Sequence, residues 1–374
     1  MTTRQATHAG SWYTSSRSQL DSSLNGWLQA VKPSEIPPRG VSAADVDVDG
    51  QLGYKRTQQA GGDAEKLSLP VDGCRAVIAP HAGYSYSGPA AAWAYATINP
   101  EKHKRIFILG PSHHHYLSGC ALSKCQKYAT PIGDLPLDLD TIGELRGTGE
   151  FEDMSLSTDE DEHSIEMHLP YVRKIWQQAD IKIVPILVGS TDFDAETKYG
   201  RLLAPYLADP ETFVVVSSDF CHWGSRFRYT HYHAPPAAPT QLRSSSTLAT
   251  TTPIHMSIRA LDAEGMSCIS FPSPAPFVGS NESDTSTQRE VVPDAKSASE
   301  ARNVWNDYLE AHHNTICGRH PIGVLLAALE ELQRRGHSSE CRFTRYEQSS
   351  QCLTARDSSV SYASAFIRIH SASS

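Results

Sequence analysis

Four short runs of apolar and mainly β-branched residues recur along the chain, and segments with a helical pattern separate them. The strand-like runs cover residues 76–78, 106–109, 183–188 and 213–216. Apolar residues at three- and four-residue spacing predict helices over residues 20–28, 90–96, 165–176, 193–207, 254–266, 304–312 and 322–335. Strands that alternate with helices favour an α/β fold with a mostly parallel central sheet flanked by helices. An alternating segment over residues 359–370 predicts a further strand.

The composition excludes several classes of protein. The formal net charge of −9 argues against binding to nucleic acid, because that requires a basic surface. No stretch of about 18 apolar residues occurs, so we expect no membrane span. The first 12 residues lack the apolar core of a secretory signal, and eight cysteines are too few for a disulfide framework. We therefore expect a cytoplasmic protein with reduced thiols, and a nuclear location is also compatible.

Three polar stretches interrupt the alternating pattern, at residues 32–73, 234–252 and 272–301. They are rich in Ser, Pro, Gly and acidic residues, which is typical of surface loops or disordered insertions. The remainder is about 280 residues long, which one α/β domain can reach. The sequence therefore predicts a single domain over residues 1–374 that carries three polar insertions.

Chemically active side chains follow three of the four predicted strands. His81 follows the first strand, His113 follows the second, and Asp219 and His222 follow the fourth. In open α/β sheets the C-terminal strand ends form the ligand crevice, so we expect these side chains to converge there. A lone histidine in a loop is more often a hydrogen-bonded structural group. The repeated placement after strands favours a functional set.

Cys317 precedes an apolar helix that has Pro321 in its first turn. The helix dipole and the neighbouring Arg319 both favour a thiolate at this position. A thiolate near two imidazoles indicates either a metal site or a nucleophile site. The spacing of these residues is not a local metal signature, and a single cysteine is most often an inert buried group.

An acidic run at residues 159–162 leads into a segment that contains His163, Glu166 and His168. Glu166 lies three residues after His163, whereas His168 falls on a different helix face. Two interpretations stay open for this segment, namely the wall of a site and a structural polar network.

Seven phrases spread over most of the chain resemble those of the Memo family, which is named for a mediator of receptor-driven cell motility. They are ATHAGSWYT (6–14), APHAGYSYSG (79–88), IFILGPSHH (106–114), DEHSIEMHLPY (161–171), VVSSDFCHWGSRFRY (215–229), NTICGRHPIGVLL (314–326) and DSSVSYAS (357–364). The resemblance implies a fold like that of the class III extradiol dioxygenases of the LigB type, which use nonhaem iron. All seven phrases lie outside the three polar stretches.

The resemblance also implies site residues. The metal pocket of Memo-like proteins matches His81, His113 and Cys317 here. His222 matches the acid/base of the related dioxygenases, and Asp219 is the neighbour expected to orient it. The dioxygenases use two histidines and a carboxylate, whereas this pattern has a thiolate as its third ligand. A thiolate shifts the preference toward softer ions, so catechol cleavage does not carry over.

The first functional hypothesis is a metal-dependent redox protein. His81, His113 and Cys317 would bind copper or iron in preference to zinc, and His222 would move protons. Its substrate would be a small molecule or an oxygen species. A weaker hypothesis is a zinc hydrolase, because three ligands leave a fourth position for water.

The second hypothesis is a binding module that retains a degenerate dioxygenase pocket. Memo-like proteins are associated with phosphotyrosine signalling and cytoskeletal control, which implies signalling proteins as partners. Trp12, Tyr13, Tyr84 and Arg226 could line a peptide groove, because aromatic residues and Arg are typical of such sites. The competing interpretation is that Trp12 and Tyr13 are an aromatic pair that caps the core.

Overall fold

The structure, a computed structural model, describes residues 2–37, 67–246, 248, 252–271 and 297–370. Most of the polar stretches predicted at 32–73 and 272–301 lies outside these residues. The stretch predicted at 234–252 is described in part, and it contains β12 (Thr240–Gln241), which pairs with β11 (His231–Tyr232). The single domain over residues 1–374 stays a prediction.

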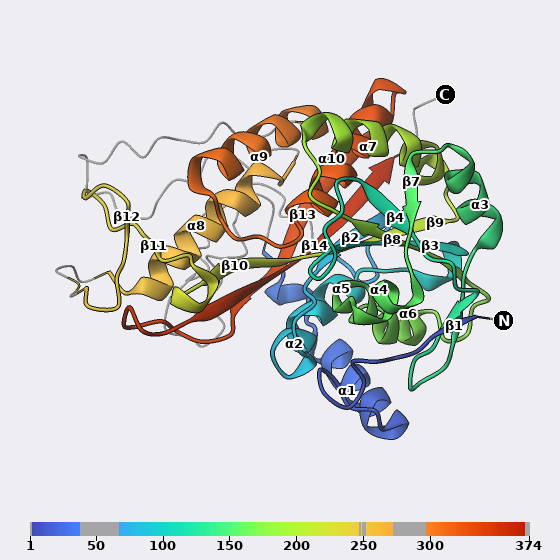
Figure 1. Cartoon of the computed structure of the whole chain (residues 1–374), viewed down its shortest axis with the longest axis horizontal. Helices are drawn as coiled ribbons and strands as arrows, with labels where there is room; N and C mark the ends of the chain where they lie inside the picture. The colour runs from blue at the N-terminus through green and yellow to red at the C-terminus, as the bar shows by residue number, and fades with distance from the viewer. Residues whose placement is uncertain (1, 38–66, 247, 249–251, 272–296, 371–374) are drawn as a thin grey trace.

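Within the described residues, the centre of the fold is a mixed sheet of nine strands (Figure 1). Its core is four adjacent parallel strands, in the order β2 (Cys74–Ala79), β9 (Thr212–Ser217), β3 (Arg105–Pro111) and β8 (Lys182–Val188). These strands confirm the four predicted runs. Nearly all of their residues are buried, as expected for parallel strands that are covered on both faces.

Antiparallel pairing extends this core on both sides. On one side, β14 (Ser359–His370) pairs with β2, with β13 (Ser338–Gln348) and with β10 (Asp219–Trp223). On the other side, β4 (Cys120–Leu122) pairs with β8, and β7 (Phe151–Asp153) runs parallel to β4. β14 confirms the strand predicted at 359–370. The sequence does not predict β10, which is only five residues long, or β13, in which charged residues interrupt the apolar pattern.

Helices cover both faces of the sheet (Figure 1). Over one face lie α7 (Phe193–Ala208) and α10 (Arg319–Arg334), with α9 (Ala298–His312) beside α10, and over the other lie α1 (Arg17–Ala30) and α2 (Tyr84–Tyr95). The described chain also contains α3 (Leu139–Gly147), α4 (Leu156–Asp161), α5 (His163–Glu166), α6 (Leu169–Ile175) and α8 (Ile254–Cys268). The helix predicted over 165–176 is thus two short helices, because Pro170 has no N–H to donate and begins a new helix. No helix of the described part is long and apolar enough to cross a membrane.

The N-terminal segment is fixed to the rest of the chain by a buried ion pair. β1 (Thr3–Arg4) pairs with β5 (Lys127–Tyr128), and Arg4 is fully buried. Its Nη1 donates to Oε2 of Glu166 at 2.7 Å. The same carboxylate accepts from the Tyr13 hydroxyl and from the backbone N–H and Nδ1 of His8. Burial alone would raise the pKa of Glu166, but the bonds from His8 and Arg4 outweigh it and bring the pKa to about 2.

Helices α7 and α10 approach each other closely because Gly200 stands at their contact. A Cβ atom at Gly200 would lie 2.5 Å from Cβ of Ala327 and 2.7 Å from its carbonyl carbon. In contrast, a Cβ atom at Gly143 in α3 would meet no atom within 4 Å.

We predict that Gly200→Ala lowers the free energy of unfolding by about 1–3 kcal/mol, because the new methyl group forces the two helices apart. The matched control Gly143→Ala should be neutral or stabilise by about 0.5–1 kcal/mol, because alanine has the higher helix propensity and the space is open. Urea unfolding of both variants measures the two effects. Equal effects at the two positions would contradict the close packing of α7 and α10.

We also predict that Glu166→Gln lowers the free energy of unfolding at pH 7 by about 3 kcal/mol, because Arg4 loses its buried counter-charge. The pKa of Glu166 is lowered from 4.5 to about 2, so its stabilisation is complete above the unfolded value and is lost as the pH falls toward 2. The difference between wild type and variant in urea unfolding should therefore be smaller at pH 3 than at pH 7. Glu35→Gln, in the exposed pair with Lys32, is the control and should change little. A difference that is independent of pH would contradict the ion pair with Arg4.

Candidate metal centre

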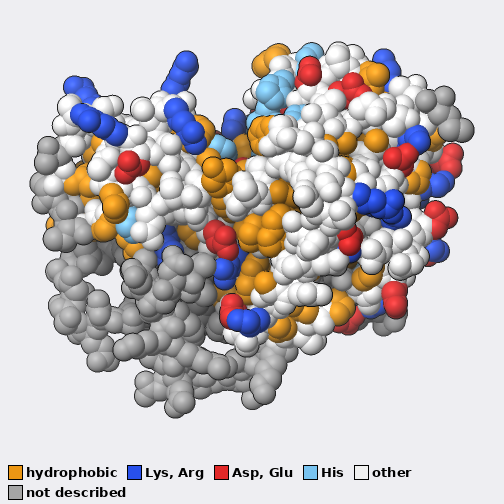
Figure 2. Space-filling view, turned by 90° about the horizontal axis from the view of Figure 1, so that it is seen from below, with side chains coloured by type: hydrophobic (Ala, Val, Ile, Leu, Met, Phe, Trp, Pro, Cys, Tyr) orange, Lys and Arg blue, Asp and Glu red, His pale blue; other side chains and the backbone are white. Residues whose placement is uncertain are grey.

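The parallel strands and the loop before α10 bring the predicted site residues to one edge of the sheet. His81 follows β2, His113 follows β3, and Asp219 begins β10 directly after β9. The ring centroids of His81 and His113 lie 5.1 Å apart, and Sγ of Cys317 lies 3.1 Å from Nε2 of His81. Figure 2 shows a notch in the molecular outline, with histidine side chains on one side and Lys or Arg side chains on the other.

A third imidazole completes this arrangement. His163, the first residue of α5, stacks on His113 with centroids 4.4 Å apart and planes 20° apart. Within the described residues, the ligand atoms of His81, His113 and His163 all lie within 4.8 Å of one another, and we call these three residues the histidine cluster. Cys317 lies beside the cluster but does not belong to that set.

His81 is held with one ring nitrogen facing the Cys317 thiol. The Ser217 hydroxyl donates to the carbonyl of Ser164, so it must accept from Nδ1–H of His81, which lies 2.6 Å away. Nε2 therefore carries a lone pair, which faces the Cys317 thiol. Burial lowers the pKa of His81 well below 6.5, and the neighbouring His113 adds to this effect. The ring is neutral at physiological pH, as a metal ligand must be.

His113 is oriented by a buried carboxylate. Glu162 accepts from the backbone N–H of His113 at 2.7 Å and from its Nδ1–H at 2.8 Å, which leaves Nε2 of His113 available. Burial alone would raise the pKa of Glu162, but the bonds from His113 outweigh it and bring the pKa to about 2. A carboxylate that holds the second nitrogen of a histidine is the usual outer partner of a metal ligand.

His163 packs against two rings. Trp12 lies against it with centroids 4.3 Å and planes 32° apart, and His113 stacks on it with centroids 4.4 Å apart. Its Nδ1 is buried without a hydrogen-bond partner, and the nearest carboxylate oxygen, on Glu162, is 3.6 Å away. Burial, with a contribution from His113, lowers the pKa of His163 to about 3, so the ring is neutral. Its neighbour His168 instead binds the Tyr95 hydroxyl through Nδ1.

The state of Cys317 differs from the expectation of a thiolate. The residue does precede the helix that begins at Arg319, but burial raises the pKa of the thiol well above 9, and nearby Asp219 raises it further. The backbone hydrogen bonds at the sulfur lower the pKa, but they do not offset these two effects. The thiol donates to His81, and the Asp219 backbone N–H donates to the sulfur at 3.2 Å.

His222 and Asp219 have separate partners. Nδ1 of His222 lies 2.9 Å from the carbonyl of Phe220 and 3.1 Å from that of Thr315, so these carbonyls orient the ring. Asp219 instead accepts from the backbone N–H of His81 at 2.8 Å. The orienting role expected of Asp219 toward His222 therefore falls to two carbonyls. Burial raises the pKa of Asp219 to about 7.

The four residues predicted for peptide binding divide into two pairs. Trp12 is 37% exposed and Arg226 is exposed. Tyr13 and Tyr84 are buried, and their hydroxyls donate inward to Glu166 and to the carbonyl of Met167. Only Trp12 and Arg226 of these four offer substantial surface to a partner.

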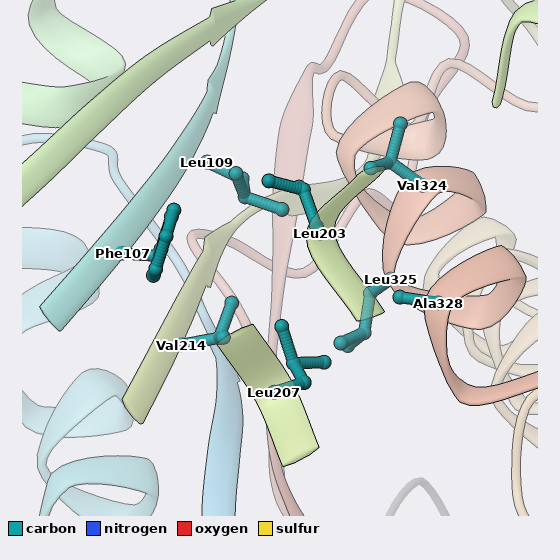
Figure 3. Close-up of a pocket in the computed structure, with 8 residues that line it drawn as sticks. All are labelled: Phe107, Leu109, Leu203, Leu207, Val214, Val324, Leu325 and Ala328. Atoms are coloured by element: carbon teal, nitrogen blue, oxygen red, sulfur yellow. The ribbon is translucent and has the colours of Figure 1, made fainter. Parts of the chain in front are cut away.

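An apolar pocket lies elsewhere, between the sheet and helices α7 and α10 (Figure 3). It is lined by Phe107, Leu109, Leu203, Leu207, Val214, Val324, Leu325 and Ala328. None of these side chains is polar, so the pocket has no group that could orient a substrate. The histidine cluster therefore remains the candidate site.

The donor set of the cluster fits a metal ion. His81 and His113 each commit Nδ1 to a protein acceptor and keep Nε2 for another partner, which at His81 is the Cys317 thiol. The buried Nδ1 of His163 lacks a hydrogen bond. Neutral imidazoles suit zinc, copper, iron and nickel, and the adjacent thiol adds a softer donor. The sequence marks His163 only as part of a segment with two possible interpretations, the wall of a site or a structural polar network. No sequence signal marks Glu162 beyond its place in the acidic run.

Comparisons with known proteins identify the relatives of this chain. The family described as Memo-like protein matches residues 65–366. Protein MEMO1 of Homo sapiens is 42% identical over 369 residues, which cover 98% of each chain, and Protein MEMO1 of Danio rerio is 42% identical over 99% of each. Protein memo-1 homolog of Caenorhabditis elegans is 37% identical over 98% of this chain and 83% of that one.

A crystal structure of an uncharacterized protein from Escherichia coli K12 is 13% identical and covers 77% of this chain and 99% of that one. Its TM-score of 0.40 is too low to support a conclusion. The match over residues 65–366 and the identity to the MEMO1 proteins are decisive: this chain belongs to the Memo family.

Proposed function

We propose that this chain is a metal-dependent redox protein that binds copper or iron through His81, His113 and Cys317. The observation that carries the proposal is the convergence of two oriented imidazoles and a thiol, with Nε2 of His81 only 3.1 Å from the sulfur. Both imidazoles have their other nitrogen fixed by an outer partner, which is the arrangement of metal-binding histidines.

The donor types favour copper or iron over zinc. A thiolate prefers soft ions such as copper(I), and imidazoles also suit iron. Either ion, when bound, would supply one-electron chemistry toward an oxygen species or a small reducible molecule. Zinc would instead make the site a candidate for hydrolysis, because it has no redox chemistry.

The protein residues around the cluster would divide the remaining tasks. His222 has its Nδ1–H committed to backbone carbonyls, so its other nitrogen is the one that would accept and return a proton. Asp219 would hold the backbone of His81 and the sulfur of Cys317 in place. Trp12 covers one side of His163 and would limit the access of water to the cluster.

We predict that the wild-type protein binds about one copper or iron ion per chain, as a three-ligand site requires. His81→Ala and His113→Ala should each reduce the bound metal to a small fraction, as measured by elemental analysis after dialysis. His370→Ala is the matched control. His370 lies beside Gly73, before β2, and thus at the opposite end of the sheet from His81.

The same measurement distinguishes the alternatives. Bound copper or iron with turnover of a redox dye would support the proposal, whereas zinc without such turnover would favour a hydrolase. Metal content that is equal in wild type, His81→Ala and His113→Ala would exclude the site altogether. Cys317→Ser should reduce the bound metal in the same way as the two histidine variants. Cys125→Ser is its control, because it removes a buried thiol elsewhere in the fold.

A phosphopeptide-binding module is the second candidate function, and the surroundings of Arg226 favour it. Its guanidinium lies over the ring of Phe227 at 4.4 Å, and the same ring lies 5.1 Å from His222. In the part of the chain that the structure describes, no carboxylate forms an ion pair with Arg226. An exposed guanidinium of this kind can donate hydrogen bonds to a phosphate group.

We predict for this candidate that Arg226→Ala and Trp12→Ala weaken binding of a phosphotyrosine peptide at least about tenfold, which is the loss of about 1.4 kcal/mol. Calorimetric titration with the phosphorylated and unphosphorylated peptide measures this, and Arg243→Ala is the control for a lost surface charge. Affinity that survives removal of metal would favour the module. Equal affinity for the two peptide forms would rule it out.

A further inference from the structure

Four aromatic rings from three helices lie in contact and form a continuous row. Trp27 of α1 lies against Tyr84 of α2, with ring centroids 5.8 Å apart. Tyr84 lies 5.7 Å from Tyr171 of α6, and Tyr171 stacks on Tyr95 at 4.5 Å with planes only 11° apart. These spacings are those of directly interacting aromatic pairs. We call these four residues the aromatic chain, which runs from the partly exposed Trp27 to the fully buried Tyr95.

The aromatic chain adjoins the histidine cluster at Tyr84. This residue follows His81 by three positions, and its backbone N–H donates to the carbonyl of Trp12 at 2.9 Å. The ring of Trp12 in turn lies 4.3 Å from that of His163. Tyrosine and tryptophan are among the side chains that lose one electron most easily. An oxidant at the cluster therefore lies beside a row of rings that can supply an electron.

The three phenols of the aromatic chain differ in the acceptor that their hydroxyl groups face. The hydroxyls of Tyr84 and Tyr171 donate to backbone carbonyls, at 2.7 Å each. The hydroxyl of Tyr95 instead lies 2.9 Å from Nδ1 of His168, and it has no other partner among the described residues, so it donates to that nitrogen. A neutral imidazole takes up a proton readily, whereas an amide carbonyl does not. Only Tyr95 of the three therefore faces a base.

Burial requires that Tyr95 lose its electron and its proton together. It raises the pKa of Tyr95 well above 10, and neighbouring Tyr171 adds to the effect, so the ring is a neutral phenol. Loss of the electron alone would leave a positive charge in a fully buried ring. Burial also lowers the pKa of His168 to about 3, so its imidazole is neutral. An oxidised phenol is a far stronger acid than an imidazolium, and the proton therefore moves to Nδ1.

Tyr13 is the competing phenol, because its ring lies 5.3 Å from that of Tyr84. Its hydroxyl donates to Glu166 at 2.8 Å, and the same carboxylate is the buried partner of Arg4. A proton on Glu166 would leave the charge of Arg4 without its counter-charge, which is costly in a buried pair. His168 forms no ion pair among the described residues, so uptake of the proton breaks none. The hydrogen bonds therefore favour Tyr95 over Tyr13.

We propose that Tyr95 is a redox-active tyrosine that gives one electron through Tyr171 and Tyr84 and its phenolic proton to Nδ1 of His168. The inference rests on the proposed function for its oxidant, which is hydrogen peroxide reduced at the histidine cluster. Peroxide takes two electrons as its O–O bond breaks, one from copper(I) or iron(II) and one from Tyr95, and it leaves as two hydroxide ions. The other products are copper(II) or iron(III), a neutral Tyr95 radical and a protonated His168.

Trp27 is the outer end of this path, because it contacts Tyr84 and is partly exposed. A small one-electron reductant such as ascorbate, in contact with Trp27, would return the electron to the Tyr95 radical. The proton would return from His168 in the same step. The protein thereby regains its starting state, and the reductant is oxidised by one electron.

The test uses two oxidants, only one of which depends on bound metal. Copper(I)-loaded protein receives hydrogen peroxide, and metal-free protein is oxidised by a photogenerated ruthenium(III) complex. Electron paramagnetic resonance measures the tyrosyl radical. Tyr95→Phe removes the phenol, and His168→Gln keeps a hydrogen-bond acceptor that takes up no proton. Tyr308→Phe is the matched control, because Tyr308 is a buried phenol outside the chain whose hydroxyl donates to the carbonyl of Leu261. Thermal unfolding checks that each variant folds.

With both oxidants we expect the same long-lived radical in wild type and Tyr308→Phe. Tyr95→Phe and His168→Gln should each lower its yield at least about tenfold. Decay of the wild-type radical by ascorbate should be slower in deuterium oxide, because the proton returns with the electron. A radical that persists in Tyr95→Phe but is lost in Tyr13→Phe would assign the role to Tyr13 and overturn the inference. Equal yields in wild type and His168→Gln would also overturn it.

Copper(I) binding by His81→Ala separates a failure of this inference from a failure of the proposed function. If wild type binds copper(I) and His81→Ala does not, the metal site is established, and the inference is wrong when peroxide yields no radical that depends on Tyr95. If His81→Ala binds copper(I) as tightly as wild type, the proposed function fails. The ruthenium(III) experiment then decides alone whether Tyr95 and His168 form a redox-active pair.

Discussion

The carboxylate of Glu162 is the interaction on which the geometry of the site depends. One oxygen accepts from the backbone N–H of His113, and the other accepts from its ring and from the backbone N–H of Ser164. A single buried side chain thus joins the end of β3 to the start of α5. That connection brings the rings of His113 and His163 into a stack, although 50 positions of sequence separate them. The low pKa of Glu162, about 2, reflects how fully these donors satisfy its charge.

The sequence predicts those parts of the fold that depend on local patterns. The four parallel strands and β14 are visible because their apolar residues are contiguous or alternate, and the placement of His81 and His113 after strands follows from sheet geometry. The sequence does not predict β13, because its charged residues pair with residues far away in the sequence, as Glu340 pairs with Arg368. The apolar spacing does not predict the break between α5 and α6, because it continues across the break. Pro170 marks the start of the second helix.

The chemistry of the site is less predictable than its location, because it depends on burial. At Cys317, the local signals of a helix start and a neighbouring cation favour a thiolate, yet burial and the approach of Asp219 raise the pKa of the thiol. His163 could not be identified as a potential ligand, because a helix of four residues has no periodicity and its partners are Trp12 and His113, both distant in sequence. These effects become visible only when the chain is folded.

The outer wall of the site depends on an electrostatic contact at a distance from it. Trp12 belongs to an N-terminal segment that joins no strand of the central sheet among the described residues. That segment is held by Arg4, whose guanidinium donates to Glu166 and to the backbone carbonyl of Glu162. Because Glu162 and Glu166 flank His163, the same contact fixes both the imidazole and the indole that covers it. A buried ion pair contributes little net stability but specifies one arrangement, since either charge alone would be costly to bury. In this protein the arrangement that it specifies is the covered side of the histidine cluster.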